Sequence, residues 1–124
     1  MFKAMVVDDS RAMRMILSRA LAESGFSVLQ APDGKQGLDT LNRERTAIGL
    51  VLVDWNMPEM NGLDFVKSVR AQADLAGIKL MMVTTETEIE QMARALEAGA
   101  DEYIMKPFTT EAIQEKLRLL GVLK

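Results

Sequence analysis

The side chains best suited to chemistry in this sequence are acids, hydroxyls and a lysine that follow short apolar runs. Asp8 and Asp9 follow one such run and Asp54 ends another, while Thr84 and Lys106 close two more. The sequence contains no cysteine and no histidine. Any nucleophile, general base or metal ligand must therefore be a carboxylate, a hydroxyl, an amide or an amine.

Three carboxylates repel one another if the fold brings them together. Two unit charges about 4 Å apart repel by about 4 kcal/mol at an effective dielectric constant of 20. Such a cluster persists only with a cation or with a shifted protonation state. Mg²⁺ suits it, because this ion binds one or two protein carboxylates, keeps several waters and leaves positions for phosphate oxygens. The acids Asp8, Asp9 and Asp54 therefore favour a divalent-cation site.

Alternating strands and helices must position these residues. Short apolar runs predict five strands, at Lys3–Val7, Phe26–Ala31, Leu50–Val53, Ile78–Val83 and Glu102–Met105. A helical pattern follows each run, so the sequence predicts an α/β fold with a parallel sheet. With 124 residues, we expect a single doubly wound (βα)5 domain over residues 1–124.

Each predicted helix begins at a capping residue and has one apolar face. The expected caps are Asp9 or Ser10, Asp33, Asn61, Thr87 with Glu90, and Thr109 or Thr110. The expected buried residues are Met13, Ile16, Leu17, Ala20, Leu21, Leu38, Leu41, Leu63, Val66, Val69, Ile89, Met92, Ala93, Leu96, Ile113, Leu117 and Leu120. Gly25 and Gly99 are expected to end the first and fourth helices.

The order of the strands decides whether the acids meet. In the order 2-1-3-4-5, strands one and three are neighbours, and their carboxyl ends form the crevice where the winding reverses. Asp8, Asp9 and Asp54 would then lie together. Trp55 is expected to be a partly exposed platform beside them, and Arg11 and Arg14 to form a solvated face.

These strand-end residues resemble the receiver domain of two-component response regulators. The resemblance is carried by Asp8-Asp9, Asp54-Trp55-Asn56-Met57-Pro58, Thr84, Tyr103 and Lys106-Pro107-Phe108. It spans essentially the whole chain and is greatest to the stand-alone chemotaxis receivers of that family. The two longer blocks are specific only in combination.

The resemblance implies a phosphorylation site. Asp54 would accept a phosphoryl group from a histidine kinase. Mg²⁺ would be bound by Asp9, Asp54 and the backbone carbonyl of Asn56, with Asp8 helping directly or through water. The protein would promote its own phosphorylation and dephosphorylation without being a dedicated enzyme.

The resemblance also assigns the remaining residues. Thr84 and Lys106 would contact the phosphoryl group, with a cis peptide bond between Lys106 and Pro107. Tyr103 would change rotamer as Thr84 moves inward. Asn56 and Glu86 would tune dephosphorylation, and both match fast chemotaxis receivers, which implies a phosphoryl lifetime on the order of seconds to minutes.

The resemblance further implies that the signal leaves by protein binding. The face around Thr87–Leu96, Tyr103 and the last helix would bind a downstream protein, in chemotaxis or control of the flagellar motor. We expect a monomer. A phosphorelay intermediate and a phosphorylation-independent interaction module stay open as alternatives.

Other classes with related sites fit less well. A haloacid-dehalogenase-type phosphatase needs a second acid two residues after its nucleophile, where this chain has Asn56. A flavodoxin-like FMN carrier needs a hydroxyl- and glycine-rich phosphate loop after the first strand, where Asp8 and Asp9 would repel a phosphate. No P-loop motif is present.

Composition narrows the partners and the compartment. The formal net charge is −3 and 48% of the residues are hydrophobic. Neither a nucleic-acid footprint nor a membrane span is indicated. The first residues lack the cleavage region of a signal peptide, so we expect a cytoplasmic protein.

Overall fold

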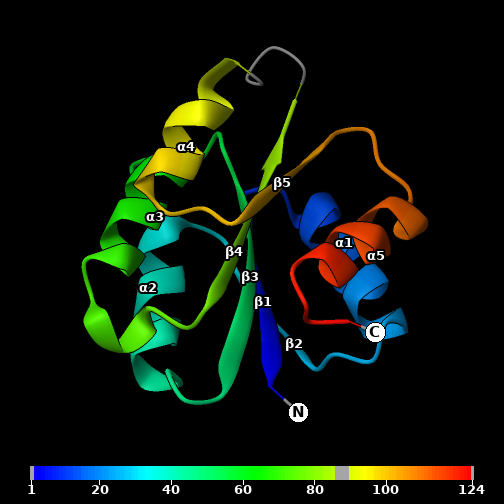
Figure 1. Cartoon of the computed structure of the whole chain (residues 1–124), viewed down its shortest axis with the longest axis horizontal. Coiled ribbons are helices and arrows are strands. Elements are labelled where there is room, and N and C mark those ends of the chain that lie inside the picture. Colours follow the sequence, from blue (N-terminus) through cyan, green and yellow to red (C-terminus); the bar gives the residue numbers. More distant parts are fainter. Residues whose placement is uncertain (1, 86–89, 124) are drawn as a thin grey trace.

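A five-stranded parallel sheet forms the centre of the computed structural model, which describes residues 2–85 and 90–123 (Figure 1). Its strand order is β2-β1-β3-β4-β5. The strands are β1 (Lys3–Val7), β2 (Val28–Ala31), β3 (Ile48–Asp54), β4 (Lys79–Thr84) and β5 (Glu102–Met105). The predicted α/β fold and strand order are confirmed.

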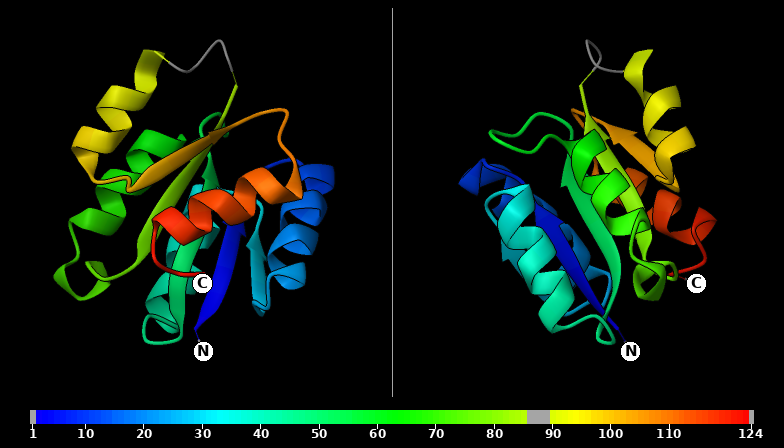
Figure 2. Two further views of the ribbon diagram at one scale, coloured as in Figure 1. Left: turned by 45° about the vertical axis from the view of Figure 1, so that its right-hand side comes forward. Right: turned by 90° about the vertical axis from the view of Figure 1, so that its left-hand side faces the viewer.

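Helices cover both faces of the sheet. Their bounds are α1 (Arg11–Glu23), α2 (Gly34–Arg43), α3 (Gly62–Arg70), α4 (Met92–Ala98) and α5 (Thr110–Leu119), with a short 3₁₀ helix at Ala73–Leu75. Helices α2, α3 and α4 lie on one face, and α1 and α5 lie side by side on the other (Figures 1 and 2). This is the doubly wound arrangement, in which parallel strands are buried on both sides.

Alternate strand residues supply two separate cores. Met5, Val51 and Val53 face the α2–α4 side, whereas Val6 and Leu52 face the α1–α5 side. All five side chains are 0% exposed. This double burial explains why the strands read as continuous apolar runs.

Side-chain caps fix where most helices begin. Ser10 Oγ accepts the Met13 N–H at 3.2 Å, so Ser10 and not Asp9 is the first cap. Thr109, not Thr110, caps α5. Asp33 and Asn61 cap α2 and α3 as predicted, and Gly99, with φ 123°, closes α4.

Three predicted strands begin at a different residue, and the fourth, predicted over Ile78–Val83, is shifted by one residue to Lys79–Thr84. The second starts at Val28 and not Phe26, because the Phe26 N–H still bonds to the Leu21 carbonyl at the end of α1. The third is longer than Leu50–Val53 and includes Ile48 and Asp54. Its extra residues continue the ladders with β1 and β4.

The predicted buried faces of α1 and α4 are partly wrong. Ile16 is 53% exposed and Leu96 is 42% exposed, and Ala93 is exposed as well. In α4, Met92 is buried as predicted, but the second buried residue is Ala95 and not Ala93 or Leu96. Glu86, Thr87 and Ile89 lie outside the described residues.

Candidate functional site

The strand register places four polar residues at one end of the sheet. Val7 pairs with Val53, so Asp8 and Asp54 follow equivalent positions of adjacent strands. Asp54 pairs with Val83, and Thr84 follows it. Thr84 in turn pairs with Met105, which directly precedes Lys106. The predicted crevice therefore collects residues from β1, β3, β4 and β5.

Three carboxylates meet in this crevice. One oxygen each from Asp8, Asp9 and Asp54 lies within 4.8 Å of the others. Asp8 and Asp54 are 1% and 6% exposed, whereas Asp9 is exposed. The cluster therefore combines two buried acids with one acid that solvent can reach.

Asp8 makes two hydrogen bonds, but only one of its two carboxylate oxygens has a partner among the described residues. Its Oδ1 accepts the Ser10 N–H at 2.9 Å, and its backbone carbonyl accepts a hydrogen bond from Arg14 Nη1 at 2.7 Å. Its Oδ2 is buried without a hydrogen-bond partner among the described residues. Burial raises the pKa of Asp8 above its usual 3.8, and the Asp9 charge adds to the rise, while the Ser10 N–H and Lys106 oppose it.

This arrangement fits a divalent cation. Asp8 Oδ2, which has no partner among the described residues, is suited to a cation, since a buried charge needs a partner. An all-oxygen donor set of carboxylates suits Mg²⁺. Asn56, the other residue expected to bind the metal, lies in the exposed turn two residues after Asp54.

Lys106 approaches Asp54 from the opposite side. Its Nζ lies 3.1 Å from Asp54 Oδ1, and the two side chains are 23% and 8% exposed. The Lys106 backbone N–H bonds to the Thr84 carbonyl at 2.7 Å, which ties the end of β5 to β4. The Lys106–Pro107 peptide bond is cis, as expected.

Thr84 lies on β4, next to the strand that Asp54 ends, and Tyr103 lies one strand further, on β5. Thr84 is 0% exposed, and its hydroxyl donates to the Thr85 carbonyl at 3.3 Å. Tyr103 is partly buried and packs against the core on the α2–α4 face. Tyr103 pairs with Met82 of β4, so it lies on the strand next to the one that carries Thr84.

Trp55 is not the partly exposed platform that the sequence predicted. It is 6% exposed and belongs to the core. Its carbonyl accepts the Gly62 N–H at 2.8 Å. A Cβ on Gly62 would lie 2.7 Å from the Asp54 carbonyl oxygen, so glycine allows α3 to begin directly against the end of β3. The indole lies in the same core as Leu63 and Phe65 of α3.

Arg14 is a site residue that the sequence did not reveal. It was predicted to lie on a solvated face, but it is partly buried and bonds to the Asp8 backbone. The relevant signal was its place one turn after the Ser10 cap. Side chains on a helix tilt toward its N-terminus, so a long side chain near the helix start can reach the end of the preceding strand.

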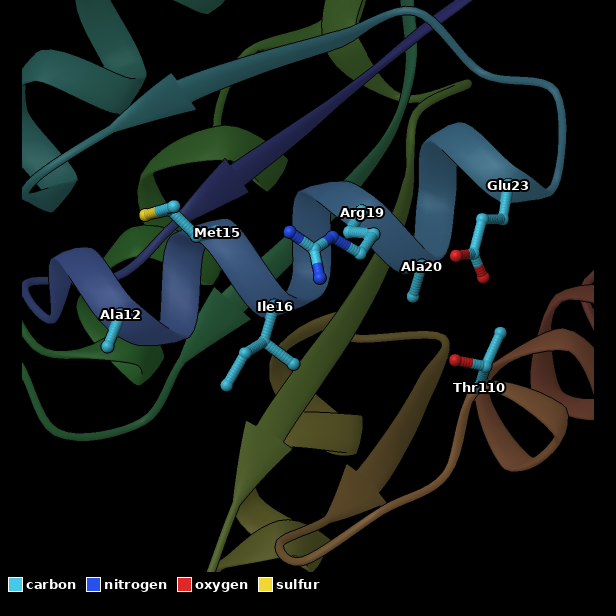
Figure 3. Close-up of a pocket in the computed structure, with 7 residues that line it drawn as sticks. All are labelled: Ala12, Met15, Ile16, Arg19, Ala20, Glu23 and Thr110. Atoms are coloured by element: carbon cyan, nitrogen blue, oxygen red, sulfur yellow. The ribbon is translucent and has the colours of Figure 1, made fainter.

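A groove of about 360 Å³ lies between α1 and the start of α5 (Figure 3). Exposed Met15 and Ile16 line it on one side, and Thr110 lies opposite Ala20 and Glu23. Its described lining includes none of the three carboxylates. It is therefore a surface feature separate from the acidic cluster.

In the part of the chain that the structure describes, no helix combines the length and the apolar character needed to span a bilayer.

Comparison with known proteins agrees with the site geometry. Residues 4–118 match the family described as response regulator receiver domain. The chemotaxis protein CheY homolog of Campylobacter jejuni is 43% identical over 116 residues, covering 93% of this chain and 88% of that protein. Chemotaxis protein CheY1 of Helicobacter pylori is 41% identical over 119 residues, 95% of each. The structure of chemotaxis response regulator CheY4 of Vibrio cholerae has a TM-score of 0.88 at 34% identity, covering 97% of this chain and 98% of that one. The chain therefore belongs to the response regulator receiver domain family, as a CheY-like member.

Proposed function

We propose that this receiver domain, spanning residues 1–124, accepts a phosphoryl group on Asp54 from a histidine kinase and signals in chemotaxis. One observation carries the proposal. The Asp54 carboxylate lies in a crevice with two further acids on one side and the Lys106 ammonium 3.1 Å away on the other. The chemotaxis role is supported by relatives named as chemotaxis proteins.

Asp8, Asp9 and Asp54, with the Asn56 carbonyl, would hold Mg²⁺. When bound, the ion neutralises charge on the acids and on the phosphoryl oxygens. Asp8 supplies a buried oxygen that has no other described partner. Asp9, which is exposed, supplies the accessible oxygen.

The chain's own residues position the transfer. A carboxylate oxygen of Asp54 attacks phosphorus, the O–P bond forms, and the N–P bond of the donor phosphohistidine breaks. Lys106, already at Asp54, pairs with the transferred group. The Thr84 hydroxyl exchanges its bond to the Thr85 carbonyl for one to the new acceptor oxygens, which are strong acceptors. Asn56 and Glu86 tune the return hydrolysis.

The output surface comprises the region around Thr87–Leu96, Tyr103 and the last helix, with Tyr103 as the switch. Exposed apolar side chains occur on all three described elements of this face: Leu96 is 42%, Met105 41% and Leu119 71% exposed. Exposed apolar surface of this kind favours a protein partner. The protein is a monomer in this proposal, and it binds neither nucleic acid nor membrane.

The test uses phosphorylation and the single tryptophan. Incubation with acetyl phosphate and Mg²⁺, or with a phosphorylated kinase, should add the mass of one phosphoryl group. Trp55 adjoins Asp54, so its fluorescence should respond to Mg²⁺ and then to beryllofluoride. Asp54→Asn should abolish the mass gain and the beryllofluoride response.

Asp39→Asn, an exposed acid on α2, is the matched control and should keep both signals. A wild-type protein that never gains the phosphoryl mass would contradict the proposal and favour an interaction module. Transfer of the label onward to a histidine phosphotransfer protein would favour the phosphorelay role.

A further inference from the structure

Lys116 of α5 reaches around the edge of the sheet to the ring of Tyr103. Its Nζ lies 5.0 Å from the ring centroid, within the range of a cation–π interaction. Strand β5 is the edge strand. Ile104 packs into the core on the α1–α5 face, whereas Tyr103 packs against the opposite core. The lysine thus connects a helix on one face with an aromatic side chain of the other.

Glu102 fixes the position of this ammonium group. Its Oε1 accepts a hydrogen bond from Lys116 Nζ at 3.1 Å and another from the Tyr103 backbone N–H at 3.0 Å. The Lys116 and Glu102 side chains are 31% and 21% exposed. The carboxylate is therefore anchored to the strand, and it holds the cation over the ring.

We propose that Glu102 and Lys116 form a latch that holds the Tyr103 ring in its present, partly buried position. Lys116 is a positioning residue, because it acts through Tyr103 and touches no reacting atom. The regulatory consequence rests on the proposed function, in which Tyr103 is the switch. A ring that leaves this position gives up its contact with the cation, so the strength of the latch sets how far phosphorylation shifts the ring.

Fluorine NMR tests the latch directly. The sequence has one tyrosine, so labelling with fluorotyrosine gives a single resonance to follow. In Lys116→Met, without any phosphate analogue, we expect the resonance to move toward its solvent-exposed position. Its shift between H₂O and D₂O should grow. The population of molecules whose Tyr103 ring has left its present position, relative to those in which it stays, should rise about threefold, as expected for loss of a partly exposed cation–π contact.

Three further variants separate the latch from a general perturbation. Glu102→Gln keeps an acceptor for the backbone N–H but loses the ion pair, so it should shift the resonance less, in the same direction. Lys116→Arg keeps the cation and should restore the wild-type signal. Lys35→Met removes an exposed lysine from α2 and should have no effect. An unchanged resonance and isotope shift in Lys116→Met would overturn the proposal.

Repeating the NMR measurement with Mg²⁺ and beryllofluoride tests the proposed function independently of the latch. A wild-type resonance that does not move on addition would contradict the role of Tyr103 as a switch and leave the latch intact. Where it does move, Lys116→Met should bind beryllofluoride about threefold more tightly, since the two equilibria are linked. An unchanged affinity there would overturn the regulatory part of the proposal.

Discussion

Asp8 shows how a single residue links the acidic cluster to the rest of the fold. It is 1% exposed, one of its oxygens has no partner among the described residues, and burial raises its pKa. In the absence of a metal, folding therefore places a poorly solvated negative charge beside Asp9 and Asp54. A cation removes this cost, and so does protonation.

The pH dependence of stability follows from this raised pKa. Without metal, the folded state retains the Asp8 proton above pH 3.8, where the unfolded chain has released it. Its contribution to stability is fully present below pH 3.8 and is lost as the pH rises through the folded pKa. In EDTA at neutral pH, Asp8→Asn should therefore raise the free energy of unfolding by about 1 kcal/mol or more.

Urea unfolding of both proteins across this pH range measures the effect. The gap between Asp8→Asn and wild type should close toward low pH, where Asp8 is neutral in both states. Asp39→Asn should show no such gap. A variant that is less stable than wild type at neutral pH in EDTA would contradict the argument.

Lys106 should affect Mg²⁺ and the phosphoryl group in opposite directions. Its ammonium lies 3.1 Å from Asp54 Oδ1, so it competes with a cation for the same carboxylate. Lys106→Met should tighten Mg²⁺ binding by roughly tenfold, about 1.4 kcal/mol, while weakening the response to beryllofluoride. Titration of Trp55 fluorescence measures both affinities. Weaker Mg²⁺ binding in the variant would show that the lysine supports the metal site.

At the scale of elements, helix α1 carries two adjacent apolar residues, one buried and the other exposed. Leu17 is 1% exposed, whereas Ile16 is 53% exposed and lines the groove beside α5. Leu17→Ala should cost about 2–5 kcal/mol of stability because it leaves a cavity in the core. Ile16→Ala should cost less than about 0.5 kcal/mol, as expected for a surface substitution.

Thermal and urea denaturation of the two variants provide the measurement, and each serves as the control of the other. Equal losses would mean that Ile16 is buried in solution, with the groove closed. The comparison therefore also tests whether the groove of Figure 3 is open in solution.

The elements predicted best are those for which local pattern and tertiary role coincide. A run such as Leu50–Val53 must be a doubly buried strand, and Asn61 must cap a helix, because each satisfies its own backbone and side-chain demands. The rotation of α1 and α4 about their axes was predicted less well. Met13, Ile16 and Leu17 are all apolar, and only packing against α5 and the sheet decides which one stays outside.

The site likewise has features that the sequence predicted and others that depend on tertiary packing. Residue types at strand ends predicted which acids would meet, since the register follows from the strand order. Burial of Trp55 could not be predicted, because it depends on the approach of α3 that Gly62 permits. The contact of Arg14 with Asp8 likewise depends on the orientation of α1 relative to β1.

At the scale of the molecule, the acidic cluster exists only when the whole sheet has formed. Asp8 and Asp9 follow β1 and Asp54 ends β3, and these strands pair over Ala4–Val7 and Leu50–Val53. Lys106 adds β5, which reaches the cluster through β4. An unfolded chain cannot bring these oxygens within 4.8 Å of one another. A metal that this cluster binds would therefore bind only the folded state, and its binding would be linked to global folding.

Mg²⁺ should consequently stabilise the entire fold. A ligand that binds only the folded state at 100 times its dissociation constant adds about 2.7 kcal/mol to the free energy of unfolding. For a domain of this size that corresponds to a rise in Tm of roughly 10 °C. Calorimetry in EDTA and in saturating Mg²⁺, with NaCl used to match the ionic strength, measures the shift.

Asp39→Asn should keep the full shift in Tm, and Asp8→Asn should lose most of it, because the neutral amide supplies no charge to the ion. An equal rise with NaCl alone, or an undiminished rise in Asp8→Asn, would show that the stabilisation comes from general charge screening and not from an ion held by the carboxylates.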